Sequence, residues 1–308
     1  MKKIFLAVAL WSCAQAAFAF TLATGPSDGT YFQIGQDIKN LVQKDGIEIQ
    51  VTPTKGSLEN IQLLGSGKVD LAIMQLDALR FVSDVLKQAQ GLDLFDRIKV
   101  VLNLYPEEIH VLSDKKDIQS FYNLEGKRVS VGTEGGGSAV SAAVLLAAYD
   151  IKPAAVTFEP FEDALKKIAD GNLDAVVFVG GAPVPFIGKL GGKLHLVRLP
   201  SNAALEQIYY RTRLGKAQYD WADADTETYA VPSALMGVDQ RDEKYASQMQ
   251  RLVLSILNGK DYLQTNGHAK WKNSIIQAYF PYRGYEPTNQ IIQIFNVLDN
   301  QGYKIVKK

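Results

Sequence analysis

Strand-like and helix-like segments alternate along most of this chain, and the alternation limits its fold more than any other feature. Strand-like segments, such as residues 47–52 in which apolar and polar residues alternate, are followed by segments with apolar residues three or four positions apart. In residues 31–45, for example, Ile34, Ile38 and Leu41 share one face of a helix. The order strand–helix–strand–helix–strand predicts a mostly parallel sheet with helices on both of its faces.

This pattern occurs twice and is followed by a third, shorter stretch. The first series predicts strands at residues 20–24, 47–52, 69–74 and 98–104, and helices at 31–45, 58–66 and 78–88. The second predicts strands at 109–112, 128–131, 156–158 and 175–179, and helices at 139–149 and 162–169. The third predicts a strand at 229–231 and helices at 246–257 and 288–300.

Two α/β lobes account for this arrangement. We expect lobe 1 to contain residues 20–108 together with about 226–308, because the third stretch returns to the first series. Lobe 2 then contains about residues 109–225. The short connection between the strands near residues 104–109 favours a hinge of crossing strands, with a ligand cleft between the lobes.

The N-terminus has the pattern of a secretory signal peptide. A positively charged start at residues 1–3 precedes the apolar residues 4–11, and Ala17-Phe18-Ala19 is a small-x-small site that predicts cleavage after Ala19. The apolar run is well short of the roughly 20 residues that cross a membrane. Lipid attachment at Cys13 is an alternative, although the bulky Trp11 fits acylation poorly. We expect a periplasmic protein that is not inserted in the membrane.

Charge and cysteine content restrict the partners and cofactors. Lys+Arg and Asp+Glu both number 33, which argues against a nucleic acid partner because such partners favour basic surfaces. Removing residues 1–19 takes away Lys2, Lys3 and the one cysteine, so the remaining charge is 31 − 33 = −2. Without a thiol, a disulfide, a thiolate metal site and a cysteine nucleophile are excluded. We expect no cofactor.

A glycine-rich loop, Gly-Thr-Glu-Gly-Gly-Gly-Ser at residues 132–138, joins a predicted strand to a predicted helix. Glycines such as Gly136 and Gly137 allow a ligand to approach the backbone, and the first N–H groups of a helix attract anions. The loop lacks the Gly-Lys-Ser/Thr of a Walker motif and the spacing of a dinucleotide motif. It therefore predicts a carboxylate or phosphate site, and the alternative is a plain turn with Ser138 at or near the N-cap.

Small polar residues follow the other predicted strands of the first series at the same edge of the sheet. Gln75 can both donate and accept hydrogen bonds, and Asp77 could hold an ammonium group or could simply cap the next helix. Asp28 is a further carboxylate in the first of these loops. The presence of these acidic residues predicts a ligand that carries an amino group.

Constellations typical of enzymes are missing from the sequence. His110, His195 and His268 lack metal-ligand spacing, and there is no G-x-S-x-G nucleophile motif. The pair Glu107-Glu108 is interpreted as solvated, because adjacent residues of a strand point to opposite faces. The sequence therefore predicts a protein that is not an enzyme.

The motifs taken together resemble the TAXI family of TRAP-transporter solute receptors. The resemblance runs through most of the chain and lies in residues 23–25, 29–31, 35, 56–60, 67–71, 75–77, 104–107, 124–132, 135–138, 171–175 and 180–183. It implies a two-lobed receptor of the type II periplasmic-binding-protein fold that delivers a ligand to TRAP-type permease subunits. Glutamate, glutamine or a related dicarboxylate is the ligand that the resemblance implies. The chain departs from the family pattern at Pro26-Ser27-Asp28 and at Tyr31-Phe32, so the exact ligand stays open.

Twelve residues are the candidate ligand-binding set. They are Thr30, Tyr31, Ser57, Asn60, Gln75, Asp77, Tyr105, Gly136, Gly137, Ser138, Gly181 and Pro183. Two other functions remain compatible with the sequence: an extracytoplasmic sensor or interaction protein on the same fold, and an exported enzyme on a similar scaffold. A neighbouring permease gene would favour the transport receptor, and a neighbouring histidine kinase gene would favour the sensor.

Overall fold

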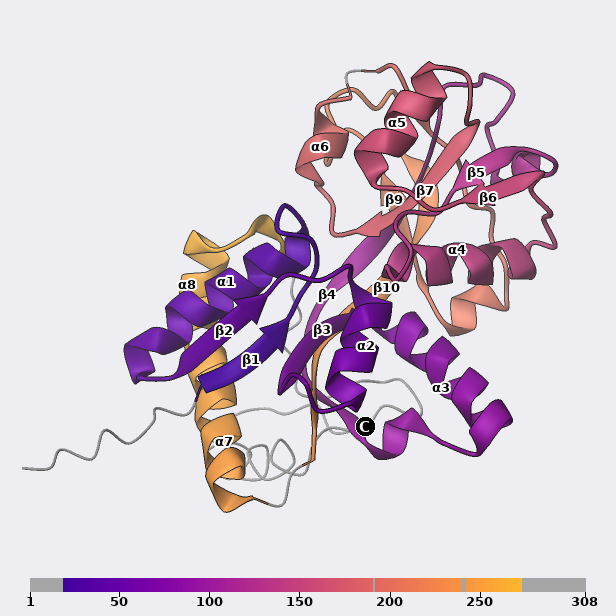
Figure 1. Cartoon of the computed structure of the whole chain (residues 1–308). Helices are drawn as coiled ribbons and strands as arrows, with labels where there is room; N and C mark the ends of the chain where they lie inside the picture. Colours follow the sequence, from indigo (N-terminus) through magenta and orange to yellow (C-terminus); the bar gives the residue numbers. More distant parts are fainter. Residues whose placement is uncertain (1–18, 191, 240–241, 273–308) are drawn as a thin grey trace, which may run out of the picture.

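One mixed sheet connects all the strands that the structure describes (Figure 1). The structure is a computed structural model that describes residues 19–190, 192–239 and 242–272. The strands are β1 (Ala19–Ala23), β2 (Glu48–Thr52), β3 (Leu71–Gln75), β4 (Ile98–Ser113), β5 (Arg128–Ser130), β6 (Ala155–Thr157), β7 (Ala175–Gly180), β8 (His195–Leu196), β9 (Tyr210–Leu214) and β10 (Thr226–Val238). Their order is β2-β1-β3-β10-β4-β7-β5-β6, with β8 beside β4 and β9 beside β10.

Helices follow most of the parallel strands. The α-helices are α1 (Thr30–Val42), α2 (Ser57–Gly65), α3 (Leu76–Gln90), α4 (Gly137–Ala148), α5 (Phe161–Ala169), α6 (Pro185–Gly188), α7 (Glu243–Asn258) and α8 (Lys260–Asn266). Short 3-10 helices lie at η1 (Gln43–Asp45), η2 (Leu94–Asp96), η3 (Phe121–Leu124), η4 (Leu205–Gln207) and η5 (Ala269–Lys272).

Two groups of elements lie on either side of the long strands β4 and β10 (Figure 1). We call the group around β1–β3, with α1–α3, α7 and α8, lobe 1, and the group around β5–β7, with α4–α6, lobe 2. Within lobe 1, β1 is parallel to β2 and β3, and within lobe 2, β5 is parallel to β6 and β7. The parallel order expected from the alternation is therefore confirmed inside each lobe. The boundaries expected from the sequence stay a prediction.

The crossing strands differ from the prediction in their length. A single strand β4 runs from Ile98 to Ser113, where the sequence predicted two strands separated near residues 104–109. Pairing with β10 explains why β4 is continuous. Strand β10 pairs with both ends of β4 and also with the Tyr-Pro-Glu-Glu segment between them, where the sequence predicted a break. Strand β10 itself has 13 residues where only residues 229–231 were expected. The short elements β8, β9 and α6 were not predicted.

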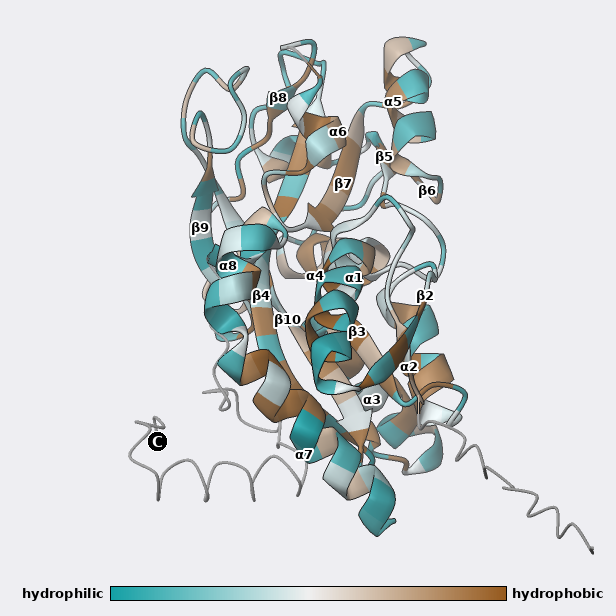
Figure 2. Cartoon of the chain, turned by 90° about the vertical axis from the view of Figure 1, so that its left-hand side faces the viewer, coloured by the Kyte–Doolittle hydropathy of each residue, from teal (hydrophilic) through white to brown (hydrophobic). Residues whose placement is uncertain are grey.

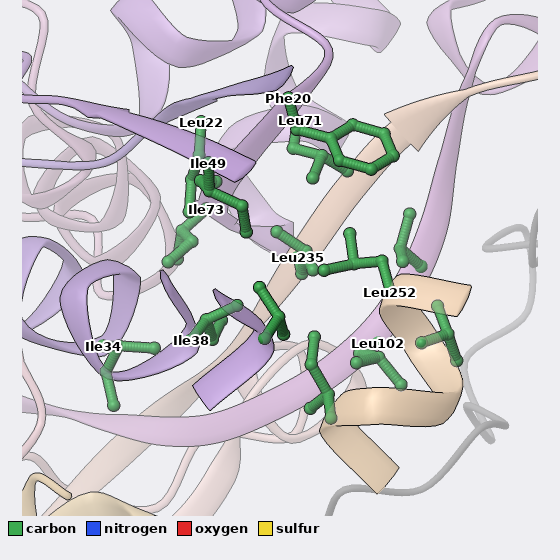
Figure 3. Packing of buried hydrophobic residues seen from close by; sticks show 14 of the residues in the cluster. Phe20, Leu22, Ile34, Ile38, Ile49, Leu71, Ile73, Leu102, Leu235 and Leu252 are labelled. Atoms are coloured by element: carbon green, nitrogen blue, oxygen red, sulfur yellow. The ribbon is translucent and has the colours of Figure 1, made fainter. Parts of the chain in front are cut away.

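The core of lobe 1 contains residues from the first and from the third stretch of sequence. Buried residues of α1, such as Ile34 and Ile38, meet Leu252 of α7 over the sheet residues Leu22 and Ile49 (Figure 3). Figure 2 shows hydrophobic and hydrophilic residues alternating along α7, as expected for a helix with one buried face. Both helices therefore cover the same face of the sheet.

A second cluster forms the core of lobe 2. Val129 of β5 and Val177 of β7 pack with Leu145 of α4 and with Tyr229 of β10. Leu235 of the same strand belongs to the core of lobe 1. Strand β10 therefore packs in the cores of both lobes.

Two predicted segments lie outside the described residues. They are most of the predicted signal peptide and the predicted helix at residues 288–300. Ala19, the predicted cleavage residue, is the exposed first residue of β1. Among the described helices, none combines the length and the apolar character that a membrane crossing requires.

Candidate functional site

A cavity of about 320 Å³ lies between the loops of the two lobes at the carboxyl ends of the strands. On the lobe 1 side it is lined by the β1–α1 loop, the β2–α2 loop, Gln75 and Glu107. On the lobe 2 side it is lined by the glycine loop, the start of α5, the end of β7 and Phe186 of α6. This is the edge at which ligands bind to open α/β sheets.

Four helices begin at this cavity. Their first residues are Thr30, Ser57, Gly137 and Phe161, and all four line it. Their N-cap residues are Gly29, Gly56, Gly136 and Pro160, and none makes a side-chain capping hydrogen bond. The first N–H groups of a helix lack partners within the helix and carry partial positive charge. At α2 the N–H groups of Leu58 and Glu59 already donate to a carbonyl of the glycine loop, and at α5 two acidic residues occupy the first turn, so the favourable sites for a carboxylate are the starts of α1 and α4.

The glycine loop touches lobe 1 directly. The carbonyl of Gly135 accepts hydrogen bonds from the backbone N–H groups of Leu58 and Glu59, at 3.2 and 3.4 Å. A Cβ added to Gly56 would lie 3.5 Å from Cα of Gly136, so the two backbones pass each other closely. Glycine at these positions permits the contact between the lobes.

Gln75 and Ser57 face the start of α4 from lobe 1. Oγ of Ser57 accepts a hydrogen bond from the backbone N–H of Gln75, and Nε2 of Gln75 donates to Oγ of Ser141. A Cβ added to Gly137 would lie 1.6 Å from Oε1 of Gln75 and 2.8 Å from Oγ of Ser57. The structure thus brings Ser57, Gln75 and Gly137, three of the twelve candidates, together between the lobes.

Ser138 does not cap α4 as expected. The N-cap is Gly136, and Oγ of Ser138 accepts a hydrogen bond from the backbone N–H of Val179 in β7. Its hydroxyl group lines the cavity while holding the end of β7 in place.

Glu107 is a buried cavity residue, and the interpretation of Glu107-Glu108 as solvated was wrong. Glu107 is 4% exposed, and its Oε2 accepts a 2.7 Å hydrogen bond from the hydroxyl of Tyr31. Burial raises the pKa of Glu107 to about 8, and burial together with the charge of Glu107 raises the pKa of Tyr31 well above its usual value. At neutral pH the carboxyl group is thus mostly protonated.

The neighbouring Glu108 points away from the cavity, as the alternation of a strand requires. Both of its oxygens accept hydrogen bonds from Nζ of Lys270, at 2.7 and 2.8 Å, and Oε2 also accepts from the backbone N–H of Ala182. Lys270 is 2% exposed and donates as well to the carbonyl of Pro106. These contacts connect η5 to strand β4 and to the loop after β7.

Asp77 does not line the cavity. Its Oδ2 accepts hydrogen bonds from the hydroxyls of Ser141 in α4 and Tyr209, at 2.6 and 2.8 Å. Burial raises the pKa of Asp77. The residue therefore links α3 to lobe 2, and it is not the N-cap of α3, because that residue is Gln75.

Four other candidates also lie away from the cavity lining. Asn60 donates to the carbonyls of Thr24 and Ile73, which fastens β1 to β3. Tyr105 is buried at 3% exposure, and Gly181 packs against it and against Lys270. Pro183, which follows a cis peptide bond, is exposed. Of the twelve candidates, those that line the cavity are Thr30, Tyr31, Ser57, Gln75, Gly136, Gly137 and Ser138.

The charged lining is mainly acidic. Lys55 is the basic residue among the described residues that line the cavity, and the acidic ones are Asp28, Glu107, Glu162 and Asp163. Sequence reasoning missed Lys55, Glu107 and the aromatic residues of lobe 2. For Lys55 and Glu107 the available signal was their place a few residues after a predicted strand, whereas Phe178 lies inside the predicted strand at residues 175–179 and Phe186 has no such signal. The described residues also contain no group of three or more His, Cys, Asp or Glu side chains that could hold a metal ion.

Sequence comparison decides the family. The profile of the NMT1-like family matches residues 22–278. The chain belongs to the NMT1-like family. The NMT1-like match extends from β1 beyond η5, so it includes every residue that lines the cavity.

Solved structures share the fold of this NMT1-like protein. A periplasmic transporter is 14% identical, with a TM-score of 0.54 over 94% of this chain and 99% of its own. A protein from Bordetella bronchiseptica RB50 is 14% identical, with a TM-score of 0.55 over 92% of this chain and 98% of its own. An ancestral arginine-binding protein bound to arginine is 14% identical, with a TM-score of 0.50 over 81% of this chain and 97% of its own. These matches confirm the two-lobed periplasmic-binding-protein fold expected from the sequence.

Proposed function

We propose that the protein is a periplasmic solute-binding receptor that binds a small organic carboxylate between its lobes and delivers it to a TRAP-type permease. The observation that carries this proposal is the cavity at which α1 of lobe 1 and α4 of lobe 2 begin without side-chain caps. Partial positive charges at helix starts stabilise a carboxylate without requiring an arginine.

Contacts from both lobes support a binding mode that depends on closure. Tyr31, Ser57 and Gln75 approach from lobe 1, and Gly137 and Ser138 approach from lobe 2. A ligand that contacts both sets binds the closed arrangement more tightly than an open one, and therefore shifts the equilibrium toward closure. Closure is the signal that a membrane permease can recognise.

The delivery partner and the location follow from the sequence motifs. The resemblance to TAXI receptors supports a TRAP-type permease as the partner, and the N-terminal pattern supports export with cleavage after Ala19. The same resemblance places glutamate, glutamine and related dicarboxylates in the first panel of ligands. We also propose that binding occurs without catalysis.

A thermal-shift measurement tests the proposal. The purified protein is stripped of carried-over ligand by partial unfolding and refolding, and is then heated with carboxylates of four to nine carbon atoms. A ligand present at about 100 times its Kd stabilises the folded state by about 2.7 kcal/mol, which is a clear shift in Tm. The methyl ester of each active acid is the matched control, and it should give a far smaller shift because it lacks the charge.

Two outcomes would overturn the proposal. If no carboxylate shifts Tm at millimolar concentration, the cavity is not a carboxylate site. That result would favour the alternative function of an extracytoplasmic sensor or interaction protein. If nuclear magnetic resonance shows that a bound ligand is chemically converted, the non-catalytic reading is wrong.

A further inference from the structure

Three phenylalanine side chains form one side of the cavity in lobe 2. They are Phe161 at the start of α5, Phe178 in β7 and Phe186 in α6, and we call them the phenylalanine wall. Their ring centroids lie 5.3 Å apart for Phe161 and Phe178, 4.8 Å for Phe161 and Phe186, and 5.2 Å for Phe178 and Phe186. The three rings therefore pack on one another and not around a central gap.

The phenylalanine wall is apolar surface that remains partly exposed. All three side chains are only half-buried, and they pack against the buried cluster that contains Ala164 and Ile187. Aromatic rings in this position gain free energy when an apolar group covers them and removes their surface from water. A ligand that fills the cavity provides such a cover.

A second carboxylate on the ligand would find no counter-charge near this wall. Among the described lining residues the basic side chain is Lys55, which is exposed and belongs to the β2–α2 loop of lobe 1. Glu162 and Asp163 follow Phe161 directly in the first turn of α5 and line the cavity too. Placing an anionic group against the phenyl rings would remove its water and bring it close to two acidic side chains, and both effects are unfavourable.

The volume of the cavity agrees with a compact ligand. About 320 Å³ lies at the lower end of the range of roughly 300–1,000 Å³ that is usual for small-molecule sites. One carboxylate and one branched or cyclic apolar group of a few carbon atoms are compatible with this size.

We propose that the ligand is a monocarboxylate with an apolar body, either branched aliphatic or aromatic, whose carboxylate lies at the starts of α1 and α4 and whose body covers the phenylalanine wall. This inference rests on the proposed function, since it names the class of carboxylate that the same cavity selects. It replaces the dicarboxylates of the first ligand panel with acids that have a single charge.

Matched pairs of acids test the choice between the two classes. Succinate and 4-methylpentanoate differ by exchange of one carboxylate for an isopropyl group, and glutarate and 5-methylhexanoate form a second pair. Isothermal titration calorimetry on the stripped, purified protein should give at least tenfold tighter binding for the branched acid of each pair. 3-Phenylpropanoate should also bind more tightly than either dicarboxylate.

Variants locate the apolar body. Phe161→Ala should weaken binding of the branched acids at least tenfold, and Phe161→Leu, which keeps an apolar side chain, should lose less. Phe158→Ala is the matched control, because Phe158 is 55% exposed and does not line the cavity. It should leave affinity unchanged. Circular dichroism establishes that each variant is folded.

The results separate this inference from the proposed function. If dicarboxylates bind more tightly than their branched partners, the carboxylate site stands and the apolar-body inference is overturned. Tightest binding of a cationic ligand such as agmatine would also overturn it, because the acidic residues would then dominate. If neither member of any pair binds, the proposed function fails and the inference fails with it. Unchanged affinity of a folded Phe161→Ala protein would place the apolar body elsewhere and contradict the inference.

Discussion

The hydroxyl of Tyr31 donates a 2.7 Å hydrogen bond to Oε2 of Glu107, and this contact connects the first helix to the strand that crosses between the lobes. Both side chains are buried and both line the cavity. The carboxyl group of Glu107 thus lies where a bound ligand must approach. Its protonation state sets the charge of that part of the cavity.

Affinity for a carboxylate should fall as pH rises through about 8. Burial raises the pKa of Glu107 to about 8, and the charges of Asp77 and Glu108 also raise it, while Tyr31 and Lys270 act in the opposite direction. Below this pH the carboxyl group is neutral, whereas above it the negative charge repels an anionic ligand. We expect affinity to drop by up to about tenfold per pH unit above pH 8, measured as Kd between pH 6 and pH 9.5.

Glu107→Gln is the matched control for the pH dependence, because glutamine can still accept the hydrogen bond of Tyr31. Its affinity should not change between pH 6 and pH 9.5. The free energy of unfolding gives a second comparison. Since the folded pKa lies above the usual 4.5, the contribution of Glu107 to stability is fully present below pH 4.5 and is lost as pH rises to about 8. A pH-independent Kd for the unmodified protein would contradict this account.

Gly137→Ala should abolish binding with a modest loss of stability. The added Cβ would lie 1.6 Å from Oε1 of Gln75 and 2.8 Å from Oγ of Ser57, so either these lobe 1 side chains or the start of α4 must shift, and the contact between the lobes changes. Overpacking of this kind typically costs about 1–3 kcal/mol, which chemical denaturation can measure. Because Gly137 and Gln75 belong to different lobes, the strain can be relieved by opening the cavity, and ligand titration should detect no binding.

Gly65→Ala provides the control for this substitution. Gly65 is the last residue of α2, and a Cβ there has open space around it. Binding and stability should remain close to those of the unmodified protein. If the Gly137→Ala protein keeps full affinity, the glycine loop does not form a wall of the binding site.

Tyr209→Phe should destabilise the protein without discriminating between ligands. The variant loses one of the two hydroxyl donors to Oδ2 of Asp77 and leaves that buried oxygen less satisfied, at a cost of about 1–2 kcal/mol. Because Asp77 does not line the cavity, the affinities for an amino acid and for its 2-oxo analogue should change by the same factor. Titration of both ligands checks this.

Tyr210→Phe is the neighbouring control, since Tyr210 is 46% exposed. It should shift the free energy of unfolding by no more than about 0.5 kcal/mol. A selective loss of amino acid binding in the Tyr209→Phe protein would instead mean that Asp77 contacts the ligand's amino group.

Lys270→Met should be strongly destabilising. Lys270 is 2% exposed and pairs with Glu108, whose side chain is 14% exposed, so the variant leaves a largely buried carboxylate without its cation. Breaking a buried pair from one side costs about 3–5 kcal/mol, measurable by urea denaturation. The double variant Lys270→Met with Glu108→Gln should recover part of this loss, because it removes the unpaired charge.

The exposed pair Lys166–Asp163 on α5 is the comparison for this ion pair. Lys166→Met should leave the denaturation midpoint unchanged, since solvent already screens the interaction. An equally small effect of Lys270→Met would show that the pair between η5 and the crossing strand does not hold the lobes.

The sequence by itself determined the local elements and the fold class. Periods of two and of three to four residues depend only on which faces of a strand or helix are buried, so they located most of the longer elements to within a few residues but missed β8, β9, α6 and α8. Glycines of the loop at residues 132–138 marked a place where the backbone passes close to another group, and Gly136 and Gly137 do so. The prediction of a break in β4 was wrong, because β10, which lies far along the chain, pairs with β4 at that place and keeps its backbone extended.

Only the tertiary structure decided which polar residues face the cavity. The sequence predicted a solvated Glu107, yet its carboxyl group is buried and accepts a hydrogen bond from a tyrosine 76 residues away. The sequence predicted Asp77 as a ligand-binding residue, and its carboxyl group accepts a hydrogen bond from a tyrosine 132 residues away. The phenylalanine wall is assembled from α5, β7 and α6, and nothing local in the sequence connects its three rings. The physical reason is that a polar or aromatic side chain takes its role from the partners that packing brings to it, and those partners lie far along the chain.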